Sequence, residues 1–364
     1  MNVQMKGNKQ ITKLLNDWYQ VMLQQRAEKA ANLKREVEEK ISDIKEDENL
    51  LLYYSLLDFR YKVLTDGLNI TKDSFNKITA FEIPDSGFIS YYYHFFKAIH
   101  EVMISNYTKA KEEFEQAEKL LMYVPNELEL AEFNYRIASF HYQTYQPLVA
   151  IQYVTKAKDT FSKHVGYEIN VASCDNVYGL SCIDLKQFEQ AEINLNSALD
   201  ILQKHNEESL VLRVRHNLAW LYANQNLSNL AIRHVSEVTR KNPKHFKALF
   251  VEAREYYKLG EHARAEELIE NGLSICNELK NKELLPHFMI LKELNNKTSA
   301  LSLEKVTLEG ISYFEEEKLW DCVQEYTEIL AHAFYQEENH VQASKYFYMS
   351  NKARKKYEEK GALK

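Results

Sequence analysis

The residue types that most often carry chemistry occur in this chain without the spacing that metal or disulfide chemistry needs. The 364 residues include four cysteines and twelve histidines. No two cysteines form a Cys-x-x-Cys pair, so we expect neither a disulfide framework nor a zinc site. The histidines are scattered, without a His-Glu-x-x-His motif, and predict no metal or other cofactor in this chain. We interpret the cysteines as buried free thiols, with Cys182 facing the core.

A cluster of carboxylates stands directly before an apolar run. Glu46, Asp47 and Glu48 are followed by Asn49 and then by the stretch LLLYYSLLDFRYKVL. Carboxylates in the first turn of a helix interact favourably with the positive end of the helix dipole. This gives Glu48 a structural role that needs no ligand.

A repeated spacing of small residues predicts the helices that position such groups. Gly179 is followed after twelve residues by Ala191 and after seven more by Ala198, and the same spacing recurs from positions 98, 138, 219, 253 and 331. Small residues let two antiparallel helices approach closely, and a large residue four positions after the middle one, such as Phe114 or Phe347, fills the remaining gap. This pattern is typical of tetratricopeptide repeats.

The chain is predicted to be all-α, with an N-terminal three-helix bundle followed by a tetratricopeptide-repeat superhelix. One degenerate copy between residues 284 and 319 brings the superhelix to about six to seven repeats. Residues 1–66 contain three amphipathic patterns and form the bundle. Residues 67–87 are rich in Gly, Asn, Asp and Ser and are predicted to be a flexible linker. The repeats occupy residues 88–364.

Charge and hydropathy exclude several classes of protein. The formal net charge is −7, and residues 1–66 carry equal numbers of basic and acidic side chains, so nucleic-acid binding is not expected. No apolar run approaches the ~18 residues of a membrane span. The first ten residues are polar and unlike a signal peptide. We therefore expect a cytoplasmic protein that does not bind membranes.

Three stretches of the chain are distinctive: NDWY (16–19), EDENLLLYYSLLDFR (46–60) and IDLKQFEQA (183–191). They resemble the Rap family, the response-regulator aspartate phosphatases and related inhibitors of sporulating bacilli. The resemblance implies that the bundle and first repeats bind a response regulator, whose phosphoaspartate site holds the magnesium ion. It also implies that a short, re-imported signalling peptide binds the concave repeat surface and inhibits the protein, as in the quorum-sensing control of sporulation and competence.

The resemblance assigns roles to individual residues. Asn217 and Asp184 match positions that hold the peptide; an amide can donate to and accept from a peptide backbone, and a carboxylate can meet a basic residue. Tyr54 and Glu132 match regulator-docking positions. Purely structural roles remain open, namely a solvated turn for Asp184, a surface amide for Asn217 and a bundle residue for Tyr54.

The catalytic position departs from the family pattern. Family phosphatases carry a glutamine that orients water for attack on the aspartyl phosphate, and Glu48 stands at the matching position. A carboxylate about 5 Å from a phosphoryl group, at an effective dielectric near ~20, adds a repulsion of about 3 kcal/mol per unit charge. That repulsion slows the reaction about a hundredfold. Whether the chain is an enzyme therefore stays open.

Two other classes of protein are weighed against a Rap-like regulator. A non-catalytic tetratricopeptide scaffold shares the repeats but does not need the 46–60 stretch. A peptide-sensing transcription factor would need a compact helix-turn-helix, whereas the first two helical patterns are too long for that unit and the bundle as a whole carries no net charge. A homodimer is left open.

Overall fold

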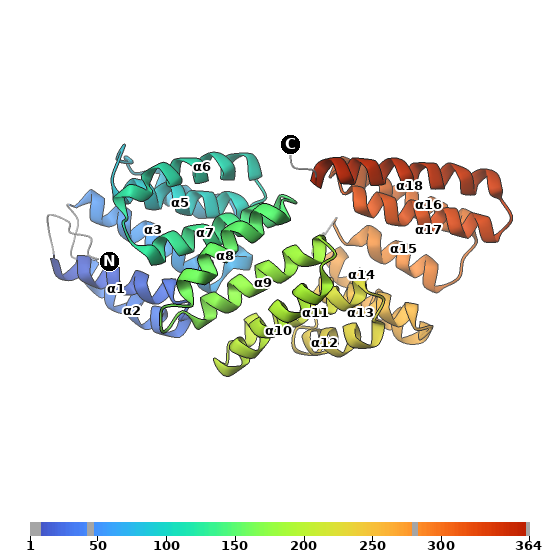
Figure 1. The fold of residues 1–364 in the computed structure, drawn as a ribbon, viewed down its shortest axis with the longest axis horizontal. Coiled ribbons are helices and arrows are strands. Elements are labelled where there is room, and N and C mark those ends of the chain that lie inside the picture. The colour runs from blue at the N-terminus through green and yellow to red at the C-terminus, as the bar shows by residue number, and fades with distance from the viewer. Residues whose placement is uncertain (1–8, 42–46, 279–282, 362–364) are drawn as a thin grey trace. The chain divides into compact units, whose positions relative to one another are not determined.

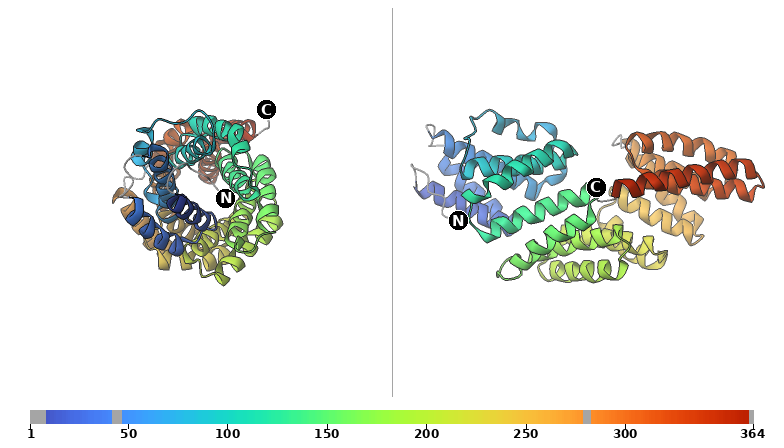
Figure 2. Two further views of the ribbon diagram at one scale, coloured as in Figure 1. Left: turned by 90° about the vertical axis from the view of Figure 1, so that its left-hand side faces the viewer. Right: turned by 45° about the horizontal axis from the view of Figure 1, so that its top comes forward.

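The computed structural model describes residues 9–41, 47–278 and 283–361. Throughout these ranges the secondary structure is helical and no strand is found, which confirms the all-α prediction (Figures 1 and 2). The elements are α1 (Lys9–Leu23), α2 (Ala27–Ile41), α3 (Glu48–Thr65), η1 (Gly67–Asn69), η2 (Lys72–Phe75), α4 (Asn76–Thr79), α5 (Phe88–Met103), α6 (Tyr107–Leu120), η3 (Leu121–Tyr123), α7 (Glu127–Gln143), α8 (Pro147–Phe161), α9 (Glu168–Asp184), α10 (Phe188–Lys204), α11 (Glu208–Asn224), α12 (Ser228–Lys241), α13 (Phe246–Lys258), α14 (His262–Glu278), α15 (Leu285–Asn295), α16 (Ala300–Glu316), α17 (Trp320–Gln336) and α18 (His340–Gly361).

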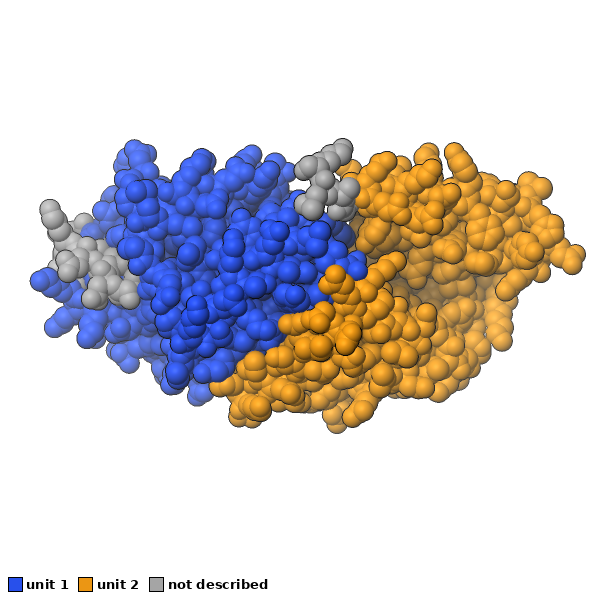
Figure 3. Space-filling view, in the orientation of Figure 1, with its two compact units in different colours: residues 1–185 blue, residues 186–364 orange. Residues whose placement is uncertain are grey.

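The chain divides into two compact units, residues 1–185 and 186–364 (Figure 3). Unit 1 contains α1 to α9 and unit 2 contains α10 to α18. The boundary falls in the turn between α9 and α10. We describe each unit by itself.

Helix pairs follow the small-residue spacing seen in the sequence. In unit 1, α5 packs on α6 and α7 on α8; in unit 2, α11 packs on α12, α13 on α14 and α17 on α18. The middle members of all six copies are buried, namely Ala110, Ala150, Ala191, Ala231, Ala265 and Ala343. One gap-filling residue was predicted wrongly: Phe347 is 40% exposed, and its neighbour Tyr346 is buried instead. Phe347 lies on α18, and its partly exposed ring contacts that of His332 on α17 at 5.2 Å.

Two further pairs keep the spacing with larger residues. In α15 and α16 it is carried by Leu291, Leu303 and Gly310, which is the degenerate copy. In α1 and α2 it is carried by Trp18, Ala30 and Val37, all buried. The α1–α2 hairpin of the bundle is therefore built like a repeat, which the small-residue pattern did not predict because its first member is tryptophan.

The turns that follow these helices share one backbone conformation. The second residue after the helix end has a positive φ at ten junctions within the described residues, and only one of the ten is a glycine. They are Gln25, Ser105, Tyr145, Lys186, Asn206, Asn226, Gly260, Lys297, Lys318 and Glu338. The α1–α2 turn thus has the geometry of the repeat turns.

The segment between the bundle and the repeats packs against its neighbours. Residues 67–87 contain η1, η2 and α4, and the side chains of Phe75 and Ile78 are buried. The ring of Phe75 lies 4.9 Å from that of Phe59 on α3 and 5.5 Å from that of His100 on α5. One apolar core runs from α1 and α3 through this segment into α5 and α7. The predicted flexibility of residues 67–87 stays a prediction.

The first helices of successive pairs also contact one another. In unit 1, α5 contacts α7 and α7 contacts α9; in unit 2, α11 contacts α13 and α13 contacts α15. Helices on the inner side of a curved array approach each other more closely than those outside. The first helices therefore line the inner face of each unit.

The remaining expectations concern thiols, metals and membranes. No disulfide joins the four cysteines, all of which lie within the described residues. Cys174, Cys182 and Cys276 are buried as expected, whereas Cys322 is only partly buried. Among the described residues, no three His, Cys, Asp or Glu side chains gather as metal ligands would. No helix in the same ranges has the length and apolar character to cross a membrane.

Candidate functional site

Glu48 is the first residue of α3, and its side chain is exposed. The preceding residue, Asp47, is the N-cap, and its carboxylate accepts a hydrogen bond from the backbone N–H of Leu50 at 3.1 Å. This bond satisfies one of the unpaired N–H groups at the helix start. Glu48 is thus held at a helix N-terminus, as expected from the acidic run.

Glu48 and Asn49 line a surface pocket of about 320 Å³. The rest of its wall is residues 81–85, the end of the segment that joins the bundle to α5. Glu82 and Asp85 add two more carboxyl groups to the wall. An ionised carboxylate in this position accepts hydrogen bonds but donates none, so Glu48 can orient water only as an acceptor.

Tyr54 lies in the packing of the bundle. It is half-buried, and its ring stacks on that of Trp18 at 6.2 Å. Burial, followed by the carboxylates of Asp58 and Glu38, raises the pKa of the Tyr54 hydroxyl. Asp58 is itself paired with Lys34 at 2.5 Å. The structure thus gives Tyr54 a packing role, and its docking role stays a prediction.

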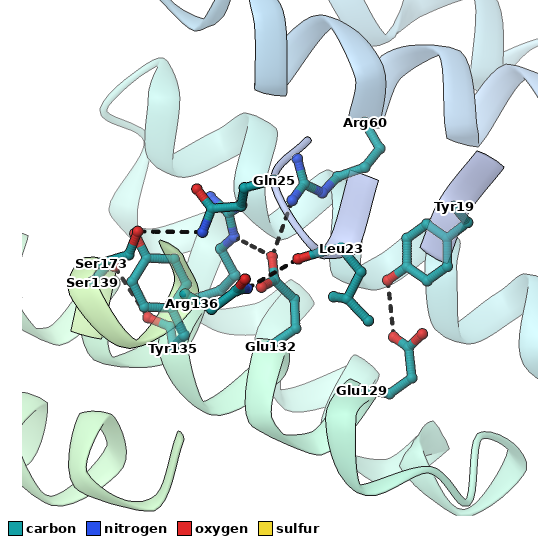
Figure 4. A network of polar contacts seen from close by, with 11 residues as sticks. Tyr19, Leu23, Gln25, Arg60, Glu129, Glu132, Tyr135, Arg136, Ser139 and Ser173 are labelled. Carbon is teal, nitrogen blue, oxygen red and sulfur yellow. Dashed lines mark hydrogen bonds and ion pairs between the residues drawn. The ribbon is translucent and has the colours of Figure 1, made fainter. Parts of the chain in front are cut away.

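Glu132 on α7 is buried between two arginines. Its Oε1 accepts hydrogen bonds from Arg60 Nη2 at 3.2 Å and from Arg136 Nε at 2.8 Å. Arg60, on α3, is only 1% exposed and Glu132 is fully buried (Figure 4). Burial alone would raise the pKa of Glu132, but the charges of Arg136 and Arg60 outweigh it and lower the pKa. Glu132 can contact a partner protein only if α3 moves away.

A second buried contact joins α7 to α1. The hydroxyl of Tyr19 donates to Glu129 Oε2 at 2.8 Å. Burial raises the pKa of Glu129 to about 7, although hydrogen bonds from Tyr19 and Tyr92 act in the opposite direction. Glu129 is fully buried, and its other oxygen, Oε1, has no hydrogen-bond partner.

Helix α9 holds the turn that follows α1. The buried amide of Asn170 donates to the backbone oxygen of Leu23 at 2.9 Å. Figure 4 shows the second contact, in which Gln25 Nε2 donates to Ser173 Oγ at 3.2 Å. We refer to the contacts of Glu129, Glu132, Asn170 and Ser173 with α1, its turn and α3 as the buried junction. It docks the bundle on the inner face of α7 and α9.

The sequence did not identify the buried junction, apart from Glu132. Arg60 stands inside the apolar stretch LLDFRYKVL, where an isolated charge indicates a buried partner. This pattern could have indicated that Arg60 is buried with a partner. The sequence gives no comparable indication for Glu129 and Asn170, because acids and amides are common on helix surfaces.

The two predicted peptide-binding residues lie in different units. Asp184 is the exposed last residue of α9, in unit 1. Asn217 is on α11 in unit 2 and is 8% exposed. It lies between Arg213 and Trp220 on one face of that helix. The peptide-binding roles of both residues stay predictions.

Comparison with known proteins connects the bundle to one family. A family model described as response regulator aspartate phosphatase H, N terminal, matches residues 5–66. Regulatory protein RapF of Bacillus subtilis (strain 168) is 24% identical over 92% of this chain and 91% of its own length. Response regulator aspartate phosphatase H of the same organism is 27% identical over 84% of each. The chain belongs to the Rap family.

Solved structures share the Rap fold with this chain. A Rap protein complexed with competence and sporulation factor aligns with a TM-score of 0.81 and 24% identity, over 97% of this chain and 99% of the other. The apo form of RapI aligns with a TM-score of 0.66 and 25% identity, also over 97% and 99%. The apo form of the quorum sensor NprR from B. thuringiensis, at 14% identity, gives a TM-score of 0.71.

Proposed function

We propose that this chain is a Rap-type quorum-sensing regulator, which binds a response regulator and antagonises it. A short signalling peptide would inhibit this activity. The match of residues 5–66 to the N-terminal model of an aspartate phosphatase carries the proposal. It is supported by relatives named as response regulator aspartate phosphatases and by a similar Rap protein solved with a peptide factor. The site of action in this proposal is the cytoplasm.

Docking would use the bundle, with Tyr54 and Glu132 at the contact. Because Arg60 and α3 cover Glu132, the regulator-binding form would differ from the present one by displacement of α3. The peptide would be held by Asn217 and Asp184. The magnesium ion needed for phosphoaspartate chemistry would be bound by the regulator.

Glu48 supports a second form of the proposal, in which the chain binds the regulator without catalysis. An exposed carboxylate at the water-positioning site repels the phosphoryl group, and Glu82 and Asp85 on the same pocket wall add to that repulsion. Antagonism would then result from blocking the regulator's other contacts.

The test measures phosphate loss from purified phosphorylated response regulators in magnesium buffer. We expect Glu48→Gln to accelerate the loss by up to about a hundredfold over the natural chain, because it removes the repulsion. Glu82→Gln is the matched variant; it removes one charge from the same pocket wall but leaves the carboxylate at position 48, so its acceleration should be much smaller than that of Glu48→Gln. A natural chain as fast as the Gln variant would make Glu48 a working catalytic residue. Failure of every form to bind any regulator would favour a scaffold.

A further inference from the structure

One face of α18 exposes large apolar side chains. Ala343, Tyr346 and Ser350 are buried on one side of this helix, so Val341 and Tyr348, seven residues apart, lie on the opposite side. Val341 is 82% exposed and Tyr348 is 72% exposed. Large apolar side chains that gather on an exposed face make that face a candidate for contact with another protein.

Two more exposed aromatic rings lie beside this face. Tyr335, near the end of α17, is 59% exposed, and its ring lies 5.2 Å from that of His340 at the start of α18. Phe347, on α18, is the second ring. Four of the seventeen exposed large hydrophobic side chains in the described ranges therefore lie within residues 335–348.

Charge is divided along the same segment. Residues 329–344, which contain the second half of α17, the turn and the start of α18, include two acids, Glu337 and Glu338, and no Lys or Arg. Residues 345–356 include five Lys and Arg and no acid. The helix dipole favours acids at the start of a helix and bases at its end. It accounts for the two ends of α18 but not for the apolar side chains between them.

Some of these charges are already used within the chain, and others point outward. Glu337 accepts a hydrogen bond from a backbone N–H at the start of α16 at 2.7 Å. Lys345 Nζ donates to the hydroxyl of Tyr346 at 3.3 Å, on the buried side of α18. Glu338 and Lys352 are exposed, so both can pair with another molecule.

We propose that α18 pairs with α18 of a second copy of this chain, antiparallel and around a two-fold axis that passes midway between Val341 and Tyr348. This inference goes beyond the proposed function and does not depend on it. Val341 of one copy then meets Tyr348 of the other, because the two residues are equally far from the axis. The same symmetry brings Glu338 of each copy near Lys352 of the other. Opposite charges thus flank an apolar centre on both sides, whereas a parallel pair would place like charges together.

The centre of this contact avoids a repulsion that the sequence alone would suggest. Lys345 lies next to the two-fold axis, where two copies would bring like charges together. Its Nζ lies 4.7 Å from the centre of the Tyr346 ring, and Tyr346 is buried. The charge is therefore turned away from the exposed face, toward Glu304 on α16, which accepts the hydrogen bond of the Tyr346 hydroxyl.

The size of the face sets the expected strength. Helix α18 has 22 residues and is about 33 Å long. One helix face of this length covers less than the ~800 Å² per partner of a stable complex, so we expect dimerisation at micromolar concentrations. Because the flanking ion pairs are exposed to solvent, salt should weaken the dimer.

The experiment is sedimentation velocity of the full chain over micromolar concentrations, with Glu338→Lys, Lys352→Glu and the variant that combines both. Because about 18 Å of helix separates the two residues within one chain, restoration in the combined variant reports a contact between copies. Lysine fits the backbone at position 338, since the corresponding turn position after α9 holds Lys186 with the same positive φ. Lys186→Glu is the control, because it reverses an exposed charge at that turn.

We expect each single charge reversal to weaken dimerisation about tenfold, because it creates two symmetric like-charge contacts. The combined variant should return to the affinity of the natural chain, and Lys186→Glu should leave it unchanged. Tyr348→Ser, which removes the apolar centre, should weaken dimerisation about tenfold or more.

Three results would overturn the proposal. One is a natural chain that stays monomeric at every concentration, and another is a dimer that neither charge reversal weakens. The third is a combined variant that dimerises no better than the single ones. Circular dichroism checks that each variant is folded, and the charge reversals keep the test complete if Tyr348→Ser is not.

Discussion

The inner faces of the two units contain similar residues in opposite states. In unit 1, the polar side chains of α7 and α9 are buried and paired with the bundle, as in the contact of Glu132 with Arg60. In unit 2, Arg213 and Trp220 on α11 are exposed, and Arg213 has no partner among the described residues. Separating a buried ion pair leaves a buried charge without a partner, which is costly. A face that carries such a pair is therefore used for contact within the chain. Exposed, unbalanced charge leaves a face available to a ligand.

The largest effect should come from breaking the buried junction. Glu132→Ala leaves Arg60 buried without its partner, which should lower the free energy of unfolding by about 3 to 5 kcal/mol. Urea unfolding followed by circular dichroism measures this change. Glu278→Ala is the control, because its partner Lys244 is exposed and exposed pairs contribute less than about 1 kcal/mol. Equal losses in the two variants would mean that the junction does not stabilise unit 1.

The same junction should make unit 1 sensitive to pH. The pKa of Glu129 rises from 4.5 to about 7 on folding, so the folded state binds more protons between these values. Its contribution to stability is therefore complete below about pH 4.5 and is lost as the pH rises to about 7, with a change of about 3 kcal/mol. The titratable groups that interact with Glu129 are Glu132 and five tyrosines: Tyr19, Tyr53, Tyr91, Tyr92 and Tyr167.

Glu129→Gln removes this titration. Relative to the natural chain, the variant should gain stability steadily as the pH rises from 4.5 to 7 and show no further change above it. Urea unfolding at four pH values measures the difference, and Glu278→Gln, which alters an exposed carboxyl, is the control. A difference that does not vary with pH would show that Glu129 keeps its ordinary pKa.

A smaller effect tests the packing of unit 2, where small residues bring the helices together. A Cβ on Gly272 would lie 2.2 Å from the ring of Phe288, whereas one on Gly310 would lie 3.2 Å from its nearest neighbour, Pro286. Gly272→Ala should therefore cost about 1 to 3 kcal/mol through overpacking, and Gly310→Ala should cost less. Thermal unfolding compares the two variants. A larger loss of stability in Gly310→Ala than in Gly272→Ala would contradict the close approach of Gly272 on α14 to Phe288 on α15.

Much of the fold could be read from the sequence because its signals are local. The acidic run before LLLYYSLLDFRYKVL indicates where a helix begins, and α3 spans Glu48–Thr65, since a capping carboxylate and an apolar run act within a few residues. The small-residue spacing located the pairs for a similar reason. It missed α1 and α2 because Trp18 fills a position that elsewhere holds a small residue.

The buried junction depends on contacts between distant segments, and these leave little trace in a single sequence. Tyr19 and Glu129 are 110 residues apart, and nothing near either residue indicates the other. Phe75 lies in a segment with the composition of a linker, yet it is buried because α3 and α5 close around it. The sequence located Glu48 and Asn217 on helices, whereas nothing in it indicated that Arg254 on α13 lies over the ring of Trp220 on α11.

The shared turn conformation has a consequence for engineering. Nine of the ten positive-φ turn positions hold residues other than glycine, and each L-residue in this conformation costs about 1 kcal/mol or more. Glycine would relieve that cost, of which its greater freedom in the unfolded chain returns only a part. Glycine substitutions at these turns should therefore increase the free energy of unfolding. Glycine could be introduced one turn at a time at the eight positions other than Gln25, whose side chain donates to Ser173 in the buried junction.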